Sequence, residues 1–393
     1  LGVRTKLEED FGEPPVVKES SLMTPEEVID TFKGLAIQHN IALMSKFNNE
    51  TSFGNLLEAA RSEKNWKNIR AYINIFEEYY TYMTQKQKFV TLHFLYELLM
   101  HREGDIRRQA GNLMGKIIAN YDEEYRKEIP DGALAKTQEL TGVQLWDRYL
   151  NAIIFPDYKV TDQHRRWIGY ALRSLIISIF ARLNAQERRK YLEVFLAYCD
   201  KDNISDQEVF VILDALLFIP LLEMEPIERL KVIQFTEEAS RRDSLEIKVC
   251  ALRVAKYMAE SDASPKVSKV IEKVVKNNGK NNIISATYLK YKILQRLGGH
   301  EERANECELV LSQYSEGISN VFLENLKVDT PWVVKAVNIE LLLDSLNRGK
   351  AGELLHITTH LSNLLKVSEK VTVRHSAGRA LLKVIGLLPL DER

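Results

Sequence analysis

Apolar residues recur along most of this chain at every third or fourth position, which is the spacing of an amphipathic helix. Val28, Phe32 and Leu35 show it in an early segment, and residues 86–100 carry a broad apolar face with the same period. Strict alternation of apolar and polar residues, which would indicate a strand, is not sustained anywhere. The pattern predicts an all-α protein.

Individual helices can be placed from their first residues or from the extent of their apolar stripe. Thr24, Pro25 and the two acids that follow form a typical helix start, with a capping side chain and then a proline in the first turn. Further helices are predicted over residues 86–100, 145–154, 186–199, 226–240 and 267–276. Residues 1–24 lack this period, so we expect an arm or linker there.

One helical layout recurs along the chain. It consists of a polar start, an aliphatic residue, a basic residue, a small residue three positions later and an apolar stripe. The clearest copies place Arg107, Lys248 and Arg374 at the basic position. With the weaker copies included, the starts lie near residues 105, 162, 206, 244, 282, 329 and 370, about 38–57 residues apart. This spacing is close to the ~40–47 residues of paired-helix repeats.

The copies at 105–110, 247–251 and 373–377 resemble the second-helix signature of HEAT repeats, in which Val-Arg-x-x-Ala recurs. The resemblance covers residues 86–390 and implies a right-handed superhelix, a HEAT/armadillo-like solenoid of about seven helix pairs. The expected organisation is an N-terminal arm at 1–24, irregular N-terminal helices at 25–85 and the repeat array at 86–393. Such arrays bind many unrelated partners, so the resemblance implies a fold and leaves the function open.

Composition excludes little by itself, because 54 basic and 55 acidic residues nearly cancel. The three cysteines lie apart in helical patterns, as expected of small apolar side chains in a reducing cytoplasm. No apolar run reaches the ~18 residues of a membrane span. We therefore expect a cytoplasmic protein that does not contact membranes. Because the chain begins at Leu1, we also expect it to be part of a larger protein.

The motifs of common catalytic sites are absent from the sequence. Neither a glycine-rich phosphate loop, a HExxH zinc motif, a His-Asp pair nor a GxSxG elbow occurs. His356 and His360 have the i, i+4 spacing of two metal ligands, but no third ligand completes a site. The sequence therefore predicts no enzyme, no cofactor and no metal site. An enzyme on the same scaffold would need a pocket of converging acidic and aromatic side chains, which the sequence does not display.

Basic residues gather on the expected second helices, which the resemblance places along a concave face. The candidate binding residues are Arg107, Arg108, Arg165, Arg166, Arg173, Lys248, Lys290, Arg296, Arg374 and Arg379. One interpretation is that they bind an acidic peptide or a nucleic-acid backbone. The other is that they pair with acids of the adjacent repeat. The leading hypothesis is an interaction scaffold or regulatory repeat region whose partner is a protein or another domain of the same chain. A nucleic-acid-binding protein is the alternative.

Overall fold

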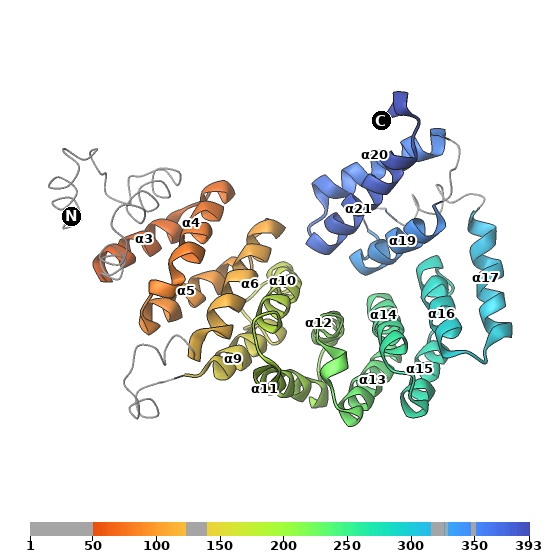
Figure 1. Cartoon of the computed structure of the whole chain (residues 1–393), viewed down its shortest axis with the longest axis horizontal. Helices are drawn as coiled ribbons and strands as arrows, with labels where there is room; N and C mark the ends of the chain where they lie inside the picture. The colour runs from red at the N-terminus through yellow and green to blue at the C-terminus, as the bar shows by residue number, and fades with distance from the viewer. Residues whose placement is uncertain (1–49, 123–139, 316–325, 327–328, 347–350) are drawn as a thin grey trace. The chain divides into compact units, whose positions relative to one another are not determined.

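The computed structural model describes residues 50–122, 140–315, 326, 329–346 and 351–393. Every regular element in these ranges is a helix (Figure 1). The helix predicted at Thr24 and the arm at 1–24 lie outside the described residues. The other five predicted helices are confirmed, as α5 (Gln85–Leu98), α9 (Gly142–Ile154), α11 (Ala185–Leu196), α13 (Pro226–Ser240) and α15 (Pro265–Asn277). The all-α prediction therefore holds for the part of the chain that the structure describes.

The chain divides into two compact units. Unit 1 comprises Leu1–Tyr149 and Tyr158–Asn184, and unit 2 comprises Leu150–Asp157 and Ala185–Arg393. Besides α5 and most of α9, unit 1 contains α3 (Glu50–Ser62), α4 (Trp66–Tyr79), α6 (Gly104–Ala119) and α10 (Asp162–Phe180). Alternate helices pack together: α3 contacts α5, and α6 contacts both α4 and α10. We call α4, α6 and α10 the second helices of unit 1. The predicted boundary at residue 86 falls inside this unit.

Aromatic rings fill the interior between the helices of unit 1. The fully buried ring of Phe76 on α4 makes edge contacts with Phe53 on α3 and Phe94 on α5, at centroid distances of 6.2 and 5.9 Å. Trp146 on α9 makes a similar contact with Phe180 on α10, at 6.4 Å. Such edge contacts add to the stabilisation that burial provides. They hold α3, α4 and α5 together and fix α9 on α10.

Helices α6 and α10 approach each other unusually closely through two glycines. A Cβ atom at Gly111 would lie 3.1 Å from Ser174 Cβ, and one at Gly115 would overlap the Ser178 side chain. The glycines are four residues apart and therefore lie on one face of α6. Ser178 Oγ uses this proximity to donate a hydrogen bond of 2.6 Å to the main-chain oxygen of Asn112. The backbones of α6 and α10 therefore pack directly against each other.

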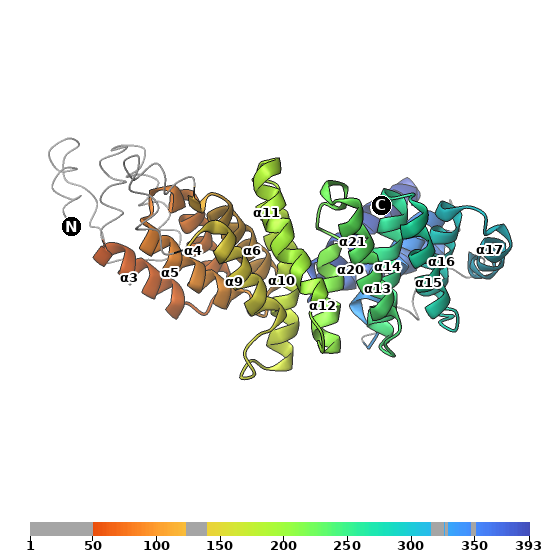
Figure 2. The same ribbon diagram turned by 90° about the horizontal axis from the view of Figure 1, so that it is seen from below.

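Unit 2 begins with the same alternation of helices. Its second helices are α12 (Asp206–Leu216), α14 (Leu245–Ser261) and α16 (Ile284–Leu297). Helix α14 contacts α12 and α16, while α13 contacts α15, so two layers form. In Figure 1, α13 and α15 lie below α14 and α16, and Figure 2 shows the same helices from below. Apolar residues at 0% exposure, such as Ile212, Leu252 and Ile271, come from both layers.

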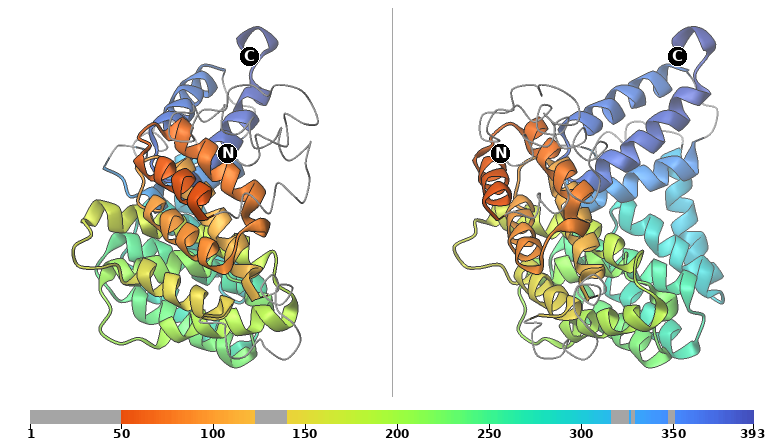
Figure 3. Two further views of the ribbon diagram at one scale, coloured as in Figure 1. Left: turned by 90° about the vertical axis from the view of Figure 1, so that its left-hand side faces the viewer. Right: turned by 60° about the vertical axis from the view of Figure 1, so that its left-hand side comes forward.

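Four helices complete unit 2: α17 (Glu301–Ser315), α19 (Trp332–Ser345), α20 (Ala351–Val367) and α21 (Val371–Leu387). Helix α17 packs on α16, and α20 packs along α21 as the blue pair in Figure 3. Helix α19 contacts α21, α16 and also α14. Because it reaches both α14 and α16, α19 lies across the second helices of its own unit.

Candidate binding surface on the second helices

The exposed face of α10 carries cationic and apolar side chains together. Arg166, Tyr170, Arg173 and Ile177 are spaced at i, i+4, i+7 and i+11, so they lie on one side of the helix. Each is exposed or half-buried, and Ile177 is 45% exposed although it is aliphatic. The opposite side of α10 is apolar and buried. The helix therefore presents a mixed stripe to its surroundings.

Helix α6 contributes a second stripe through half-buried residues at i, i+4 and i+8. These are Arg108, Asn112 and Lys116. Because α6 and α10 are in direct contact, we treat the two stripes together. The α6–α10 surface is defined by Arg108, Asn112, Lys116, Arg166, Tyr170, Arg173 and Ile177. Four of these seven residues are cations and none is an acid.

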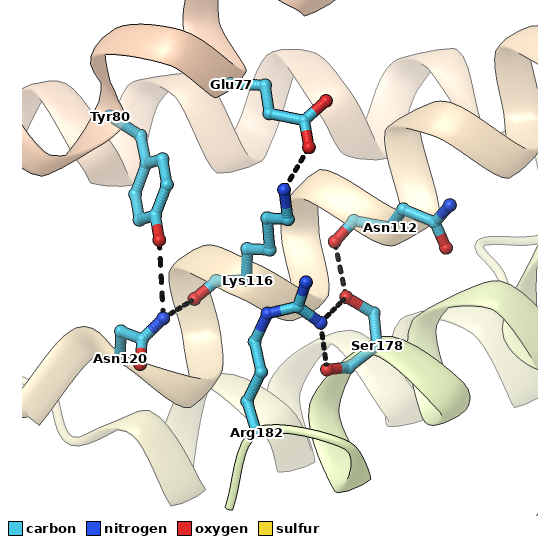
Figure 4. Close-up of polar contacts among 7 residues, drawn as sticks. All are labelled: Glu77, Tyr80, Asn112, Lys116, Asn120, Ser178 and Arg182. Atoms are coloured by element: carbon cyan, nitrogen blue, oxygen red, sulfur yellow. Dashed lines mark hydrogen bonds and ion pairs between the residues drawn. The ribbon is translucent and has the colours of Figure 1, made fainter.

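A polar network holds the α6 side of this surface in place (Figure 4). Lys116 Nζ pairs with Glu77 on α4, and Asn120 Nδ2 donates to the main-chain oxygen of Lys116 at 3.1 Å. The same amide nitrogen lies 3.4 Å from the Tyr80 hydroxyl. Glu77 on α4 therefore orients the Lys116 side chain, while Asn120 holds the end of α6.

The network continues onto α10 through Ser178 and Arg182. Arg182 Nη1 donates to the Ser178 main-chain oxygen at 2.7 Å and to its Oγ at 3.0 Å. Ser178 in turn donates to Asn112, so its hydroxyl links the end of α10 to the middle of α6 (Figure 4). These bonds restrain α6 and α10 before a partner arrives. The surface would therefore lose less conformational entropy when a partner binds.

Three of the ten candidate residues bind main-chain oxygens that lie five or six residues before them. Arg107, which is 2% exposed, donates to His101 at 2.6 Å and to Arg102 at 2.8 Å. Arg165 donates to Val160 at 3.1 Å, and Arg374 donates to Ser368 at 3.1 Å. All three fasten the turn in front of their own helix, which is α6, α10 or α21. The basic residue of the repeated layout therefore has a role inside the fold at these positions.

Arg107 also packs against aromatic rings of the neighbouring helix. Its guanidinium carbon lies 5.5 Å from the centre of the Trp167 ring and 5.9 Å from that of Tyr170. The planar guanidinium suits both kinds of contact, because it can donate in its plane and stack on its face. Arg107 thus joins α10 to the turn before α6, and its position in the core removes it from the α6–α10 surface.

Lys290 is also part of the fold of unit 2. Its Nζ donates to the main-chain oxygen of Asn281 at 2.9 Å and to that of Asn278 at 3.3 Å. Burial lowers the pKa of this lysine. It fastens the turn between α15 and α16, as Arg107 fastens the turn before α6.

The six remaining candidates lie at or near the surface. Arg108, Arg166 and Arg173 fall together on the α6–α10 surface of unit 1. In unit 2, Arg296 and Arg379 are exposed and Lys248 is half-buried, but they lie on three different helices, α16, α21 and α14. Sequence reasoning missed Tyr170 and Ile177, although the 3.6-residue period places both on the face that carries Arg166 and Arg173.

Pairs between basic and acidic residues of neighbouring helix pairs do occur, but they use other side chains. Arg189 Nη1 donates to Glu228 at 2.8 Å, and Arg242 Nη1 donates to Asp206 at 2.6 Å. The partners are 39 and 36 residues apart, close to one repeat. Among the candidates, Arg108 approaches an acid, Asp105, at 3.9 Å on its own helix.

In unit 2 the second helices meet at a buried cluster. Lys370 Nζ, just before α21, lies 3.0 Å from Asp214 Oδ2 on α12 and 4.4 Å from the centre of the Trp332 ring on α19. Arg253 Nη1 on α14 lies 4.0 Å from Asp214 Oδ1. The Trp332 ring also contacts Phe210 on α12, at 5.8 Å. The cluster therefore joins α12, α14, α19 and the start of α21.

A second set of polar contacts fixes α19 on α16. Lys292 Nζ lies 2.9 Å from Asp344 Oδ2, and the Tyr288 hydroxyl donates to the same carboxylate. Burial and the bond to Asp344 raise the pKa of Tyr288, so its hydroxyl keeps its proton at neutral pH. In unit 2 the second helices thus already hold a helix of the same chain.

The histidine pair lies on α20, with ring centroids 5.0 Å apart. Burial and the nearby His356 lower the pKa of His360. In the ranges that the structure describes, no group of three or more His, Cys, Asp or Glu side chains could hold a metal ion. None of the described helices has the length and apolar character needed to cross a membrane. No protein-family model matches this chain, and no curated protein matches it either.

Proposed function

We propose that this protein is a non-catalytic interaction scaffold, or the regulatory repeat region of a larger protein, that binds a protein partner on its second helices. The α6–α10 surface carries this proposal, because its cations and the exposed Ile177 lie together on one face. The glycine contacts between α6 and α10 support it as well, since a surface that is ordered beforehand loses less entropy on binding.

The packing in unit 2 provides a physical precedent. There the second helices α14 and α16 bind α19, with the ring of Trp332 and the ammonium of Lys370 at the contact with α12. The same chemistry, an aromatic or aliphatic group beside a charge pair, is available to a partner on unit 1. The partner in this proposal is another protein or another domain of the same chain.

The proposal treats the described helices as part of a HEAT/armadillo-like array that works in the cytoplasm. The repeated layout around Arg107, Lys248 and Arg374 supports this assignment, as does the alternation of helices within each unit. Ion pairs between residues 36 and 39 positions apart are consistent with one repeat of such an array.

Nucleic-acid binding is the second candidate, and the four cations of the α6–α10 surface favour it. A titration of the full chain with an oligonucleotide at two salt concentrations separates the two candidates. Binding through phosphates would weaken steeply as salt rises, because each phosphate contact releases counterions. Binding of a protein through a mixed apolar and charged surface would depend less on salt.

Site-specific photo-crosslinking tests the scaffold directly. A photoreactive amino acid is placed at Asn112 on α6, and at the exposed Lys273 on α15 as a matched control. In extracts of the cells that produce the protein, we expect a discrete protein adduct from position 112 and none from position 273. Adducts with nucleic acid, or the same proteins at both positions, would refute the proposal.

A further inference from the structure

The stripe on α10 suggests the chemistry of the partner. Along about three turns of helix it carries Arg166, Tyr170, Arg173 and Ile177 in that order, so Tyr170 lies between the two arginines and Ile177 follows Arg173. A partner that matches this order has acidic side chains opposite the two arginines and an apolar side chain beyond them, opposite Ile177. Because charge complementarity and apolar burial would act at adjacent positions, such a partner would be selected by both.

Acidic side chains already accompany the two cations of α6. Asp105 approaches Arg108 at 3.9 Å, and Glu77 pairs with Lys116. Arg166 is exposed on α10, so its guanidinium is within reach of a partner.

Nucleic acid fits this stripe less well than a peptide does. The exposed aliphatic side chain of Ile177 lies one turn beyond Arg173, where a phosphate backbone would leave it without an apolar contact. One ring contact of Tyr170 is already taken by the buried Arg107, at 5.9 Å. Stacking of an unpaired base would have to compete with this contact.

We infer that the α6–α10 surface docks an acidic peptide segment that places an apolar side chain, such as Leu or Phe, over Ile177 and carboxylates at Arg166 and Arg173. This inference rests on the proposed scaffold function and narrows its partner to one chemical class. The segment lies along α10, and the α6 residues Asn112 and Lys116 border it.

The test is a selection from a phage-displayed library of random peptides 16 residues long, with the full chain as bait. Enriched peptides should carry several acids together with an apolar residue. Their synthetic, fluorescein-labelled forms are then titrated against wild type, Arg166→Glu, Ile177→Asp and a control. The control is Lys269→Glu with Lys273→Glu on α15, which reverses two exposed cations elsewhere in the chain.

Each of the two α10 variants should weaken binding at least tenfold, while the control stays within twofold of wild type. Circular dichroism and thermal melting of each variant show that it remains folded. The inference is overturned if the selection enriches no peptide or if the enriched peptides are neutral or basic. It is also overturned if the enriched peptides bind Arg166→Glu as tightly as wild type. A 20-nucleotide oligo-dT that binds, loses affinity in Arg166→Glu and is insensitive to Ile177→Asp would show a nucleic-acid site instead.

The two levels of the proposal can fail separately. If the crosslinked protein from position 112 is captured equally by wild type, Arg166→Glu and Ile177→Asp, the scaffold function stands and the acidic-peptide dock on α10 is wrong. If neither crosslinking nor selection yields a partner, both fail.

Discussion

Lys370 Nζ lies 3.0 Å from Asp214 Oδ2, which joins two residues 156 positions apart in the chain. Both side chains are almost completely buried, and Arg253 Nη1 lies 4.0 Å from the other carboxylate oxygen. One acid thus faces two cations in the interior of unit 2. Desolvation of charges is costly, so this arrangement depends on the carboxylate.

The cluster predicts unequal effects for its two partners. Asp214→Asn removes the carboxylate that faces the buried Lys370 and Arg253 and should cost about 3–5 kcal/mol of unfolding free energy. Lys370→Met keeps Asp214 beside Arg253 and replaces the lysine with an apolar side chain, so its cost should be clearly smaller. Urea denaturation of the two variants measures the difference. Equal losses would mean that Arg253 does not neutralise Asp214.

Arg107 is a buried cation that holds the fold together, whereas Arg166 is a cation on the surface. Arg107→Met removes the buried donor to the turn at His101 and Arg102, and should cost about 1.5–3 kcal/mol. Arg166→Met changes an exposed side chain and should alter stability by no more than about 0.5 kcal/mol. Chemical denaturation of both variants gives the comparison. A stability loss at Arg166 that matches the loss at Arg107 would contradict their assignment here.

Two glycines should respond to alanine with opposite signs. In Gly115→Ala the new methyl group would overlap Ser178 and lie 3.1 Å from Ile179 N, which should destabilise unit 1 by about 1–3 kcal/mol. Gly54 on α3 has no atom within 4 Å of an added Cβ, so Gly54→Ala should stabilise by about 0.5–1 kcal/mol through helix propensity. Thermal unfolding of both variants, followed by circular dichroism, distinguishes close packing from propensity. A Gly115→Ala protein as stable as wild type would show that α6 and α10 can separate without cost.

Asp262 links the stability of unit 2 to pH. Burial tends to raise the pKa of this carboxyl, but hydrogen bonds from Ser264 and the charge of Arg229, whose Nε lies 2.7 Å away, lower the pKa below its ordinary value. Because the folded pKa is lowered, this contribution to stability is present above the unfolded pKa of about 4 and is lost as pH falls through the folded pKa.

The corresponding variant is Asp262→Asn, which keeps an acceptor for the Ser264 amide but loses the charge that faces Arg229. It should be less stable than wild type at pH 7 by about 1–3 kcal/mol. The difference should narrow in urea denaturation below about pH 4, as the wild-type carboxyl takes up a proton. A difference that stays constant down to pH 3 would show that the charge of Asp262 contributes nothing.

Most of the helices could be predicted because their signals are local. Pro226 begins α13 as the proline in its first turn indicates, and the apolar stripe of residues 267–276 falls within α15 (Pro265–Asn277). The candidate binding residues were harder to sort. Arg107 and Arg166 are both cations near the start of a second helix, and sequence alone does not separate them. Their fates differ because Arg107 meets the rings of Trp167 and Tyr170, whereas Arg166 points outward.

The sequence by itself determined that the described chain is helical, where many helices begin, and which face of each is apolar. These properties depend on residues within a few turns of one another. The tertiary structure decided that Asp214 meets Lys370 and that Gly115 meets Ser178. Such pairs depend on how helices that are distant in the sequence pack together. The apolar period of a helix shows which of its faces is buried but does not show which other helix that face contacts. Stacking also decided which basic residues hold the turns in front of their helices and which remain on the α6–α10 surface.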